Sequence, residues 1–378
     1  MKKITLIAMC LAFAASALTA QNLSTPPNGE NQKCIVTQFI GAIVSVSVEY
    51  HSPDVTSPQG ADRTDKIWGQ LIPFGLTDLQ FGLRNPSPWR AGANENTVIT
   101  FSHDVLINGQ ALAAGTYGLH LVAEESDPWI WIFSTNSSAW GSYFYEEGRD
   151  ALRVTTDPVN GDFHEWLTYH FTDRQPESTE LSLSWENKRI PMQIEVDDMN
   201  ALYLATFEDE LKGAAGFNHV NWVSASAFLT QNEYNMDKAL EWAELAINAP
   251  FFGTKNWTTL QNKAAVQMKM DDMADAQETM MEAVNHPSST AFQIHGFGRQ
   301  LIGLGMADKA LEVFELNYEK YDAAWPTNVG MARGLSAVGR YEEALKYAKL
   351  ALDEAPDQLN KDGMAQAVEK LEQKQDIN

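Results

Sequence analysis

Cysteine is nearly absent from the sequence, which contains only Cys10 and Cys34. Two cysteines cannot form a disulfide framework, a cysteine-rich zinc site or an iron–sulfur cluster. If Cys10 is removed with the N-terminal leader described below, Cys34 is alone and can form neither an internal disulfide nor a redox-active pair. Cys34 directly precedes an apolar stretch, so we expect it to be a small buried hydrophobic residue.

Positive charge is also scarce, because 27 Lys and Arg residues stand against 50 Asp and Glu residues, for a net charge of −23. Such a chain repels phosphate backbones and anionic lipid surfaces, which disfavours nucleic acids and membranes as partners. Apolar residues make up 44% of the sequence and aromatic residues 10%, so each domain can bury a core. A chain of 378 residues is expected to form two or three domains.

The familiar motifs of cofactor and metal chemistry are missing. We find no glycine-rich dinucleotide or phosphate loop and no Gly-x-Ser-x-Gly elbow. His164-Glu165 is followed by Thr168 where a zinc-protease helix has its second histidine. Residues 157–162 lack the spacing of a calcium loop and are expected to form a hairpin turn. We therefore expect no cofactor and no metal, and the sequence assigns no catalytic residue.

A long apolar run occurs only at the N-terminus. Lys2 and Lys3 precede the apolar run Ile4–Leu18, and Leu18-Thr19-Ala20 is a suitable cleavage site before Gln21. The alternative is a membrane anchor, but the run is short for a span of about 20 residues. A lipoprotein signal is disfavoured because Met9 precedes Cys10. We therefore predict a signal peptide at 1–20, an N-terminal linker at 21–34, and export to the periplasm or the cell exterior.

Residues 35–196 alternate between apolar and polar side chains, which is the pattern of half-buried strands. About nine short strands separated by turn signals predict an antiparallel β-sandwich or barrel. Turns are expected at Asn108-Gly109 and at 186–188, and Pro191 indicates that the last strand lies at a sheet edge. The predicted strands are 44–50, 98–101, 105–107, 115–122, 129–133, 152–156, 166–171, 181–185 and 190–196.

Helical periodicity replaces this alternation after residue 197. A helical linker at 197–216 is expected to end in a break between Gly213 and Gly216. From 217 to 378 an internal repeat follows, with aligned alanines at spacings close to 34 residues: Ala239, Ala276, Ala310 and Ala344. This spacing resembles the tetratricopeptide repeat, which implies stacked helix pairs closed by a capping helix at about 358–374.

The β half contains five distinctive segments: KIWGQLIPFG (66–75), WRAGANENTVITFS (89–102), LINGQALAAGTYGLHLV (106–122), AWGSYFY (139–145) and HEWLTYHF (164–171). Together these segments resemble a secreted bacterial domain family of unknown function. The resemblance covers approximately residues 33–195 and implies an extracytoplasmic β-rich domain, but no activity. The sequence departs from the family pattern by about a dozen additional residues, Leu76 to Pro88.

The WRAGANE segment provides the candidate site of the β half. Its Arg, Asn and Glu side chains supply donors and acceptors for a sugar or a small anion, with a tryptophan as stacking platform. The candidate ligand-binding residues are Trp68, Trp89, Arg90, Asn94, Glu95 and His164. The alternative is an Arg90–Glu95 pair that fixes the loop to the sandwich, which we favour from sequence alone. Trp129 and Trp131 share one strand face and are expected in the core, whereas Trp140 stays undecided.

The first helix of each repeat is expected to line a concave face that binds a protein or peptide partner. The candidate partner-binding residues on these helices are Trp222, Asn262, Lys263, Arg299 and Arg333. Amide and basic groups of this kind bind an extended backbone and a carboxylate. The alternative is that Trp222 belongs to the core and that the polar groups only solvate the surface.

Two classes of function are compatible with these features. The favoured hypothesis is an exported binding or scaffold protein, with a β domain for a small ligand or glycan and helical repeats for a protein or peptide. The alternative is an envelope hydrolase that uses a polar pocket around Arg90, Asn94 and Glu95. A purely structural envelope component is a third interpretation.

We predict that export is accompanied by cleavage near Ala20-Gln21, because the leader combines a charged start, an apolar run and a small-residue site. Intact-mass measurement of the protein from its native source is expected to give a chain that begins near Gln21. Retention of Met1, or a lipid on Cys10, would contradict this prediction.

Overall fold

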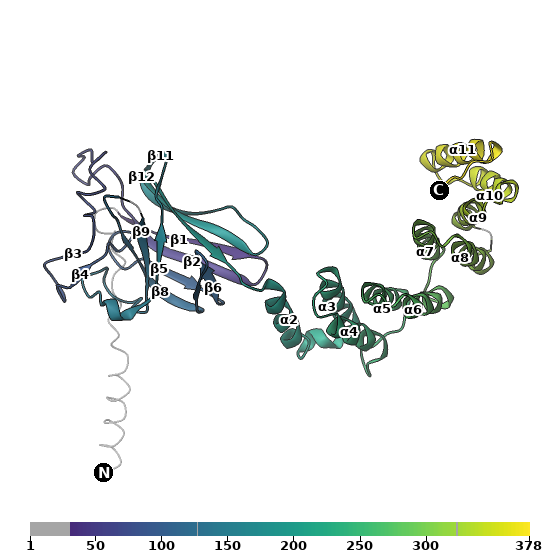
Figure 1. Ribbon diagram of the computed structural model, residues 1–378, viewed down its shortest axis with the longest axis horizontal. Coiled ribbons are helices and arrows are strands. Elements are labelled where there is room, and N and C mark those ends of the chain that lie inside the picture. Colours follow the sequence, from purple (N-terminus) through teal and green to yellow (C-terminus); the bar gives the residue numbers. More distant parts are fainter. Residues whose placement is uncertain (1–30, 127, 323) are drawn as a thin grey trace, which may run out of the picture. The chain divides into compact units, whose positions relative to one another are not determined.

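The computed structural model describes residues 31–126, 128–322 and 324–378 (Figure 1). The predicted signal peptide, Cys10 and most of the predicted linker 21–34 lie outside these residues. The chain divides into two compact units, with the boundary between Met199 and Asn200. We refer to them as the β unit and the helical unit.

The β unit contains two larger antiparallel sheets and a short two-stranded ribbon (Figure 1). The six-stranded sheet has the order β1 (Gln32–Ile40), β2 (Val44–Ser52), β5 (Val98–Phe101), β8 (Gly115–Val122), β9 (Trp129–Ser134) and β10 (Asp150–Thr156). The four-stranded sheet has the order β11 (Val159–Thr172), β12 (Ser178–Glu195), β6 (Val105–Ile107) and β7 (Gln110–Leu112). The ribbon pairs β3 (Thr77–Asp78) with β4 (Pro86–Ser87), and a 3-10 helix, η2 (Glu147–Arg149), precedes β10.

The core of the β unit lies between the inner faces of the two larger sheets. Tyr169 of β11 packs edge-on against Tyr50 of β2, with ring centroids 4.8 Å apart, and also contacts Trp131 of β9. Trp129 and Trp131 are both buried, so their prediction as core residues is confirmed. The predicted antiparallel β fold is confirmed as well. Cys34 differs from its prediction, because it lies within β1 and is only half-buried.

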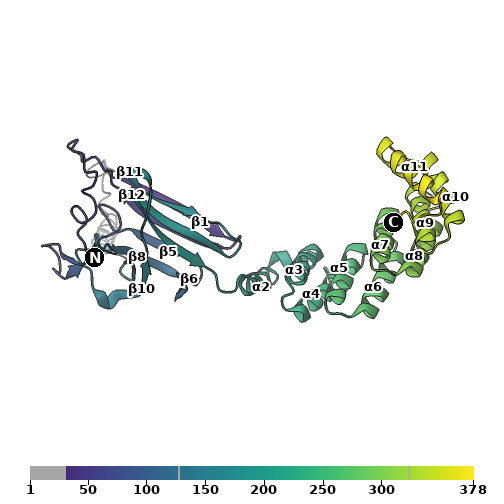
Figure 2. The same ribbon diagram turned by 45° about the horizontal axis from the view of Figure 1, so that its top comes forward.

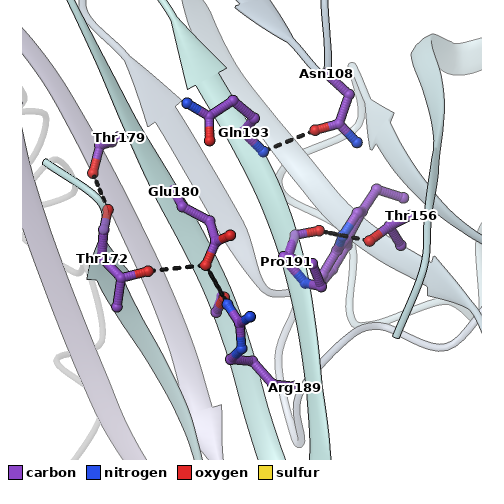
Figure 3. A network of polar contacts seen from close by, with 10 residues as sticks. Asn108, Thr156, Thr172, Thr179, Glu180, Arg189, Pro191 and Gln193 are labelled. Carbon is purple, nitrogen blue, oxygen red and sulfur yellow. Dashed lines mark hydrogen bonds and ion pairs between the residues drawn. The ribbon is translucent and has the colours of Figure 1, made fainter. Parts of the chain in front are cut away.

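The chain reverses its direction within β12. The guanidinium of Arg189 contacts the carboxylate of Glu180 and donates to Ser182 Oγ at 3.1 Å. An extended strand would separate residues nine positions apart by about 30 Å, which these side chains cannot span. The reversal coincides with Glu186, which has a φ of +53°, and agrees with the predicted turn at 186–188. Figure 3 shows Arg189 at one end of this hairpin, and Thr179 and Gln193 toward the other.

Two expectations about the ends of strands are wrong. β12 lies between β11 and β6, so Pro191 does not mark a sheet edge. On β12, only Ile194 and Glu195 pair with β6, so the missing N–H of Pro191 leaves no hydrogen bond of that ladder unformed. The carbonyl oxygen of Pro191 accepts a hydrogen bond from Thr156 Oγ1 at 2.6 Å (Figure 3). Residues 157–158 connect β10 to β11 in different sheets, so this segment is not a hairpin turn.

The expected turn between β6 and β7 is confirmed. Asn108 and Gly109 have φ values of +45° and +78°, which suits the tight primed turns of hairpins. Asn108 Oδ1 also accepts from the backbone N of Gln193 at 2.8 Å, so the turn is fixed to β12 (Figure 3).

The helical unit begins with α2 (Met199–Glu210) and a 3-10 helix, η3 (Ala214–Phe217), at the predicted glycine break. Helices then follow one another in pairs and end in a single helix, α11 (Gln358–Glu372) (Figure 2). The pairs are α3 (His219–Gln231) with α4 (Met236–Asn248), α5 (Trp257–Lys269) with α6 (Met273–Asn285), α7 (Ala291–Gly303) with α8 (Ala307–Lys320), and α9 (Trp325–Ala337) with α10 (Tyr341–Asp353). The aligned alanines of the repeat are all buried. The predicted helical repeat fold is therefore confirmed.

Close packing around Phe314 sets the spacing of three helices. Phe314 of α8 is fully buried. A Cβ atom on Gly298 of α7 would lie 2.5 Å from its ring, and Cβ atoms on Gly330 and Gly334 of α9 would lie 2.6 and 2.8 Å from it. Glycine at these three positions therefore lets α7 and α9 approach the same aromatic ring.

We predict that Gly298→Ala lowers the free energy of unfolding by about 1–3 kcal/mol, because the added methyl group overpacks the buried ring of Phe314. Gly296→Ala in the same helix is the matched control, since its Cβ meets no atom within 4 Å. This control is expected to raise stability by up to about 1 kcal/mol through helix propensity alone. Urea unfolding followed by circular dichroism measures the stability of both variants. An equal change in the free energy of unfolding for Gly298→Ala and Gly296→Ala would contradict the prediction.

Candidate binding sites

The WRAGANE segment forms a tight loop between β4 and β5. The backbone of Trp89 exchanges two hydrogen bonds with Leu121 of β8, at 3.0 and 2.8 Å, which ties the loop to the six-stranded sheet. Ala91 and Asn94 have φ values of +50° and +55°, so the chain turns sharply twice within the segment. These turns separate the side chains of Arg90 and Glu95.

Arg90 and Glu95 therefore do not form the predicted pair. The guanidinium of Arg90 donates to the backbone carbonyl of Asn94 and lies over the ring of Tyr143, 5.3 Å from its centroid. The carboxylate of Glu95 instead lies 3.1 Å from Nε2 of His51 on β2.

Four tryptophans pack together beneath this loop. Trp68 contacts Trp129, Trp89 and Trp185, with ring centroids 4.9, 5.7 and 6.0 Å apart, and Trp89 stacks on Trp185. The indole of Trp89 also donates to the carbonyl of Gly92 at 3.0 Å. Trp68 and Trp89 are thus largely committed to packing, rather than serving as open platforms for a ligand.

A cavity of about 470 Å³, which we call the β cavity, opens beside this cluster. Of the six predicted ligand-binding residues, Trp89, Arg90 and Asn94 line it. Trp68 instead lines a separate cleft with Glu186 and Lys188. Glu95 lines neither cavity, and His164 lies on β11, where its ring stacks on His170 at 6.2 Å.

Two aromatic residues of the β cavity, Trp140 and Tyr143, were not assigned to a site from the sequence. Trp140 is 52% exposed and lines the cavity together with Tyr143. The sequence feature that could have indicated this turn is Gly141, next to Trp140. Gly141 has a φ of +56°, which favours glycine. A Cβ on Gly141 would lie 2.7 Å from the guanidinium of Arg90, so this turn packs directly on Arg90.

His120 lies buried behind Arg90. Its Nδ1 is 3.1 Å from Ser142 Oγ, next to the turn that carries Trp140. Burial, with a smaller contribution from the positive charge of Arg90, lowers the pKa of His120 to about 4. His120 is therefore neutral at pH 7 and acts as a packing and hydrogen-bonding residue behind the cavity.

The helical unit contains a second cavity of about 480 Å³, which we call the helical cavity. It is lined by residues of α7, α9 and α11, including the cations Arg299, Arg333 and Lys370. Among the described residues that line it, none is Asp or Glu. Burial and the charge of Arg299 lower the pKa of Arg333, with Asp376 acting in the opposite direction. Burial and these two arginines lower the pKa of His295 to about 4.

The other predicted partner-binding residues make contacts within the unit. Trp222 stacks on Phe252 at 5.3 Å and donates to the carbonyl of Gly216. Asn262 donates to Ser226 Oγ at 2.9 Å, and Lys263 pairs with Glu244 at 3.1 Å. Of the five candidates, the structure brings only Arg299 and Arg333 together around one cavity.

Within residues 31–126, 128–322 and 324–378, His, Cys, Asp and Glu form no group of three that could hold a metal ion. None of the helices in these ranges is long and apolar enough to span a membrane.

The architecture is that of an antiparallel β domain followed by a helical repeat unit. Residues 32–194 match the model of a family described as "Protein of unknown function (DUF2911)", which confirms the resemblance predicted from the sequence. No curated protein matches the chain.

Solved structures of tetratricopeptide repeat proteins are similar to part of the chain. YrrB, titled "a TPR protein with an unusual peptide-binding site", is 20% identical over 43% of this chain and 81% of its own, with a TM-score of 0.31. A tetratricopeptide repeat protein from Parabacteroides merdae is 18% identical over 45% of this chain and 66% of its own, with a TM-score of 0.32. MamA AMB-1 is 14% identical over 41% of this chain and 81% of its own, with a TM-score of 0.28. Likenesses this distant carry no conclusion about ligands.

We predict that His120 makes the stability of the β unit depend on pH between about 6.5 and 4. In this pH range His120 binds a proton in the unfolded chain but stays neutral in the folded protein. The free energy of unfolding therefore falls as the pH falls. The lowered pKa of His120 corresponds to a decrease in the free energy of unfolding on the order of 3 kcal/mol, and this decrease is nearly complete at pH 4.

Urea unfolding of the wild type and of His120→Asn, measured at pH 7 and pH 4.5, tests this effect. The variant is expected to lose less stability on acidification than the wild type. His295 and the carboxylates are common to both proteins and cancel in the comparison. Parallel losses in the two proteins would exclude the assigned role of His120.

Proposed function

We propose that the protein is an exported binding and scaffold protein whose helical unit binds an extended acidic segment of a partner protein. The observation that carries this proposal is the helical cavity, in which three cations meet and no described lining residue is Asp or Glu. An anionic side chain or a terminal carboxylate complements such a site.

The charge of the surrounding unit makes this cavity unusual. Residues 197–378 contain 15 Lys and Arg against 28 Asp and Glu, a net charge of −13. Burial, together with the nearby charge of Arg299, nevertheless lowers the pKa of Arg333. Placing like charges together in a partly buried cavity costs free energy, which a bound anion offsets.

The rim of the helical cavity is apolar. Phe292 is 67% exposed and Leu359 is 82% exposed, and both line the cavity beside Trp325. Exposed apolar side chains next to cations match a segment that carries a hydrophobic residue beside an acidic one. This supports a peptide partner more than a free inorganic anion.

Export is the second part of this proposal. It rests on Lys2, Lys3, the apolar run 4–18 and the small-residue site before Gln21. The partner would then be a periplasmic, envelope or extracellular protein.

A small ligand or glycan on the β unit is a second candidate function, favoured by the β cavity and its half-exposed Trp140. The geometry supports binding more than hydrolysis, because Glu95 pairs with His51 and does not line the cavity. A hydrolase that uses Arg90, Asn94 and Glu95 together therefore has less support.

The helical cavity is tested by Arg299→Glu combined with Lys370→Glu. Both side chains are exposed and line the cavity, so the change reverses its charge without disturbing the core. A photo-crosslinker at Phe292 is expected to capture a partner in the native envelope, and the double variant is expected to reduce capture about tenfold or more.

Lys309→Glu with Lys346→Glu is the matched control, since these exposed lysines of α8 and α10 give the same change in net charge outside the cavity lining. Mass spectrometry of the crosslinked peptides is expected to identify segments rich in Asp or Glu, or a C-terminus. Equal capture by the two double variants would overturn the assignment of the site.

A further inference from the structure

The β cavity is built by several chain segments that the sequence keeps apart. Residues 71–94 form one wall, and the turn that carries Trp140 and Tyr143 forms another. The rest of the lining comes from Trp185, Asn31 and the segment 53–63, which includes Asp54 and Arg63. Gly82 and Leu83 hold the two walls together: a Cβ on Gly82 would lie 2.1 Å from the carbonyl oxygen of Tyr143, and the N–H of Leu83 donates to this oxygen at 3.0 Å. The additional segment 76–88 is therefore part of the cavity wall.

Arg90 carries a positive charge that the protein does not neutralise locally. No ion pair joins Arg90 to a carboxylate of the described residues. Asp54, which also lines the cavity, pairs with Arg63 at 3.6 Å, and Glu95 lies 3.1 Å from His51. Its hydrogen bond to the Asn94 carbonyl occupies one of the five N–H donors of a guanidinium. The remaining donors are suited to a bidentate contact with a carboxylate.

Trp140 presents a flat apolar surface to the same cavity. It is 52% exposed, and no described aromatic ring packs against it. Leaving so large an apolar side chain half in water costs free energy that a bound ligand recovers. A sugar ring fits such a surface, because its C–H face packs on the indole while its hydroxyl groups at the edge remain available for hydrogen bonds.

We infer that the β cavity binds a saccharide unit that bears a carboxylate, with Trp140 stacking on the ring and Arg90 binding the acid group. This inference rests on the proposal that the β unit binds a small ligand or glycan. A neutral sugar would leave the guanidinium of Arg90 without an anionic partner. A polyanion such as a nucleic acid is disfavoured by the net charge of −23 and by the small number of cations in the cavity.

The experiment titrates the full mature protein with uronic-acid trimers (glucuronate, mannuronate and galacturonate) and with their neutral counterparts. Isothermal titration calorimetry gives the affinity. Because the chain has 11 tryptophans, contact with Trp140 is reported by the part of the fluorescence change that is lost in Trp140→Ala. At least one acidic trimer is expected to bind about tenfold or more tightly than its neutral counterpart. Trp140→Ala and Arg90→Gln are each expected to weaken this binding about tenfold or more.

Trp166→Ala is the matched control. Trp166 is a similarly exposed tryptophan, at 46%, but it lies on β11 and does not line the cavity. It is expected to leave the affinity unchanged. Because Arg90 also packs on Tyr143 and Gly141, Arg90→Lys provides a milder variant, which keeps the charge and is expected to weaken binding less than Arg90→Gln.

Three results would overturn the inference: equal affinity for acidic and neutral trimers, unchanged affinity in Trp140→Ala, or no binding of any trimer. Native mass spectrometry of the protein from its own envelope separates this failure from that of the broader proposal. A co-purifying molecule that is not a saccharide would leave the β unit as a ligand-binding unit and refute only the acidic sugar. A protein without any bound molecule, together with no binding of trimers, would count against both.

Discussion

The packing of four tryptophans holds the β unit and its cavity together. Trp129 belongs to the six-stranded sheet, Trp185 to the four-stranded sheet, and Trp68 and Trp89 to the loops that cover them. Large aromatic side chains contribute strongly to core stability and prefer edge-on or offset contacts of the kind seen here. Because Trp89 is anchored in this cluster, the adjacent Arg90 has a defined position at the wall of the cavity.

Each unit of this strongly acidic chain contains a cavity that is lined in part by arginine side chains. In the helical unit, Arg333 is partly buried and lies near the like charge of Arg299. Both effects disfavour its charged form, which is why the pKa of Arg333 is lowered. In the β unit, a single guanidinium rests on Tyr143 and forms no ion pair with a described carboxylate. The net negative charge of the whole chain disfavours long polyanions such as nucleic acids as ligands of either cavity.

The helical unit achieves its close packing with small residues. Buried alanines at the aligned repeat positions allow paired helices to approach, and three glycines do the same around Phe314. This packing places α7 and α9 side by side, so that Arg299 and Arg333 reach one cavity. Lys370 joins them from α11, which follows the last helix pair.

The sequence by itself determined the properties that depend on local spacing. The alternation of residues 44–50 identified β2, the pair Asn108-Gly109 identified a hairpin turn, and the spacing of the aligned alanines identified the helix pairs. These signals are local because side-chain periodicity follows directly from backbone geometry. The tertiary structure alone decided which distant groups meet. It paired Glu95 with His51, packed Trp68 into a cluster of tryptophans, and brought Lys370 and Arg299 to one cavity. Such contacts depend on how the chain folds back on itself. Residue types and their spacing along the sequence do not reveal which distant segments come into contact.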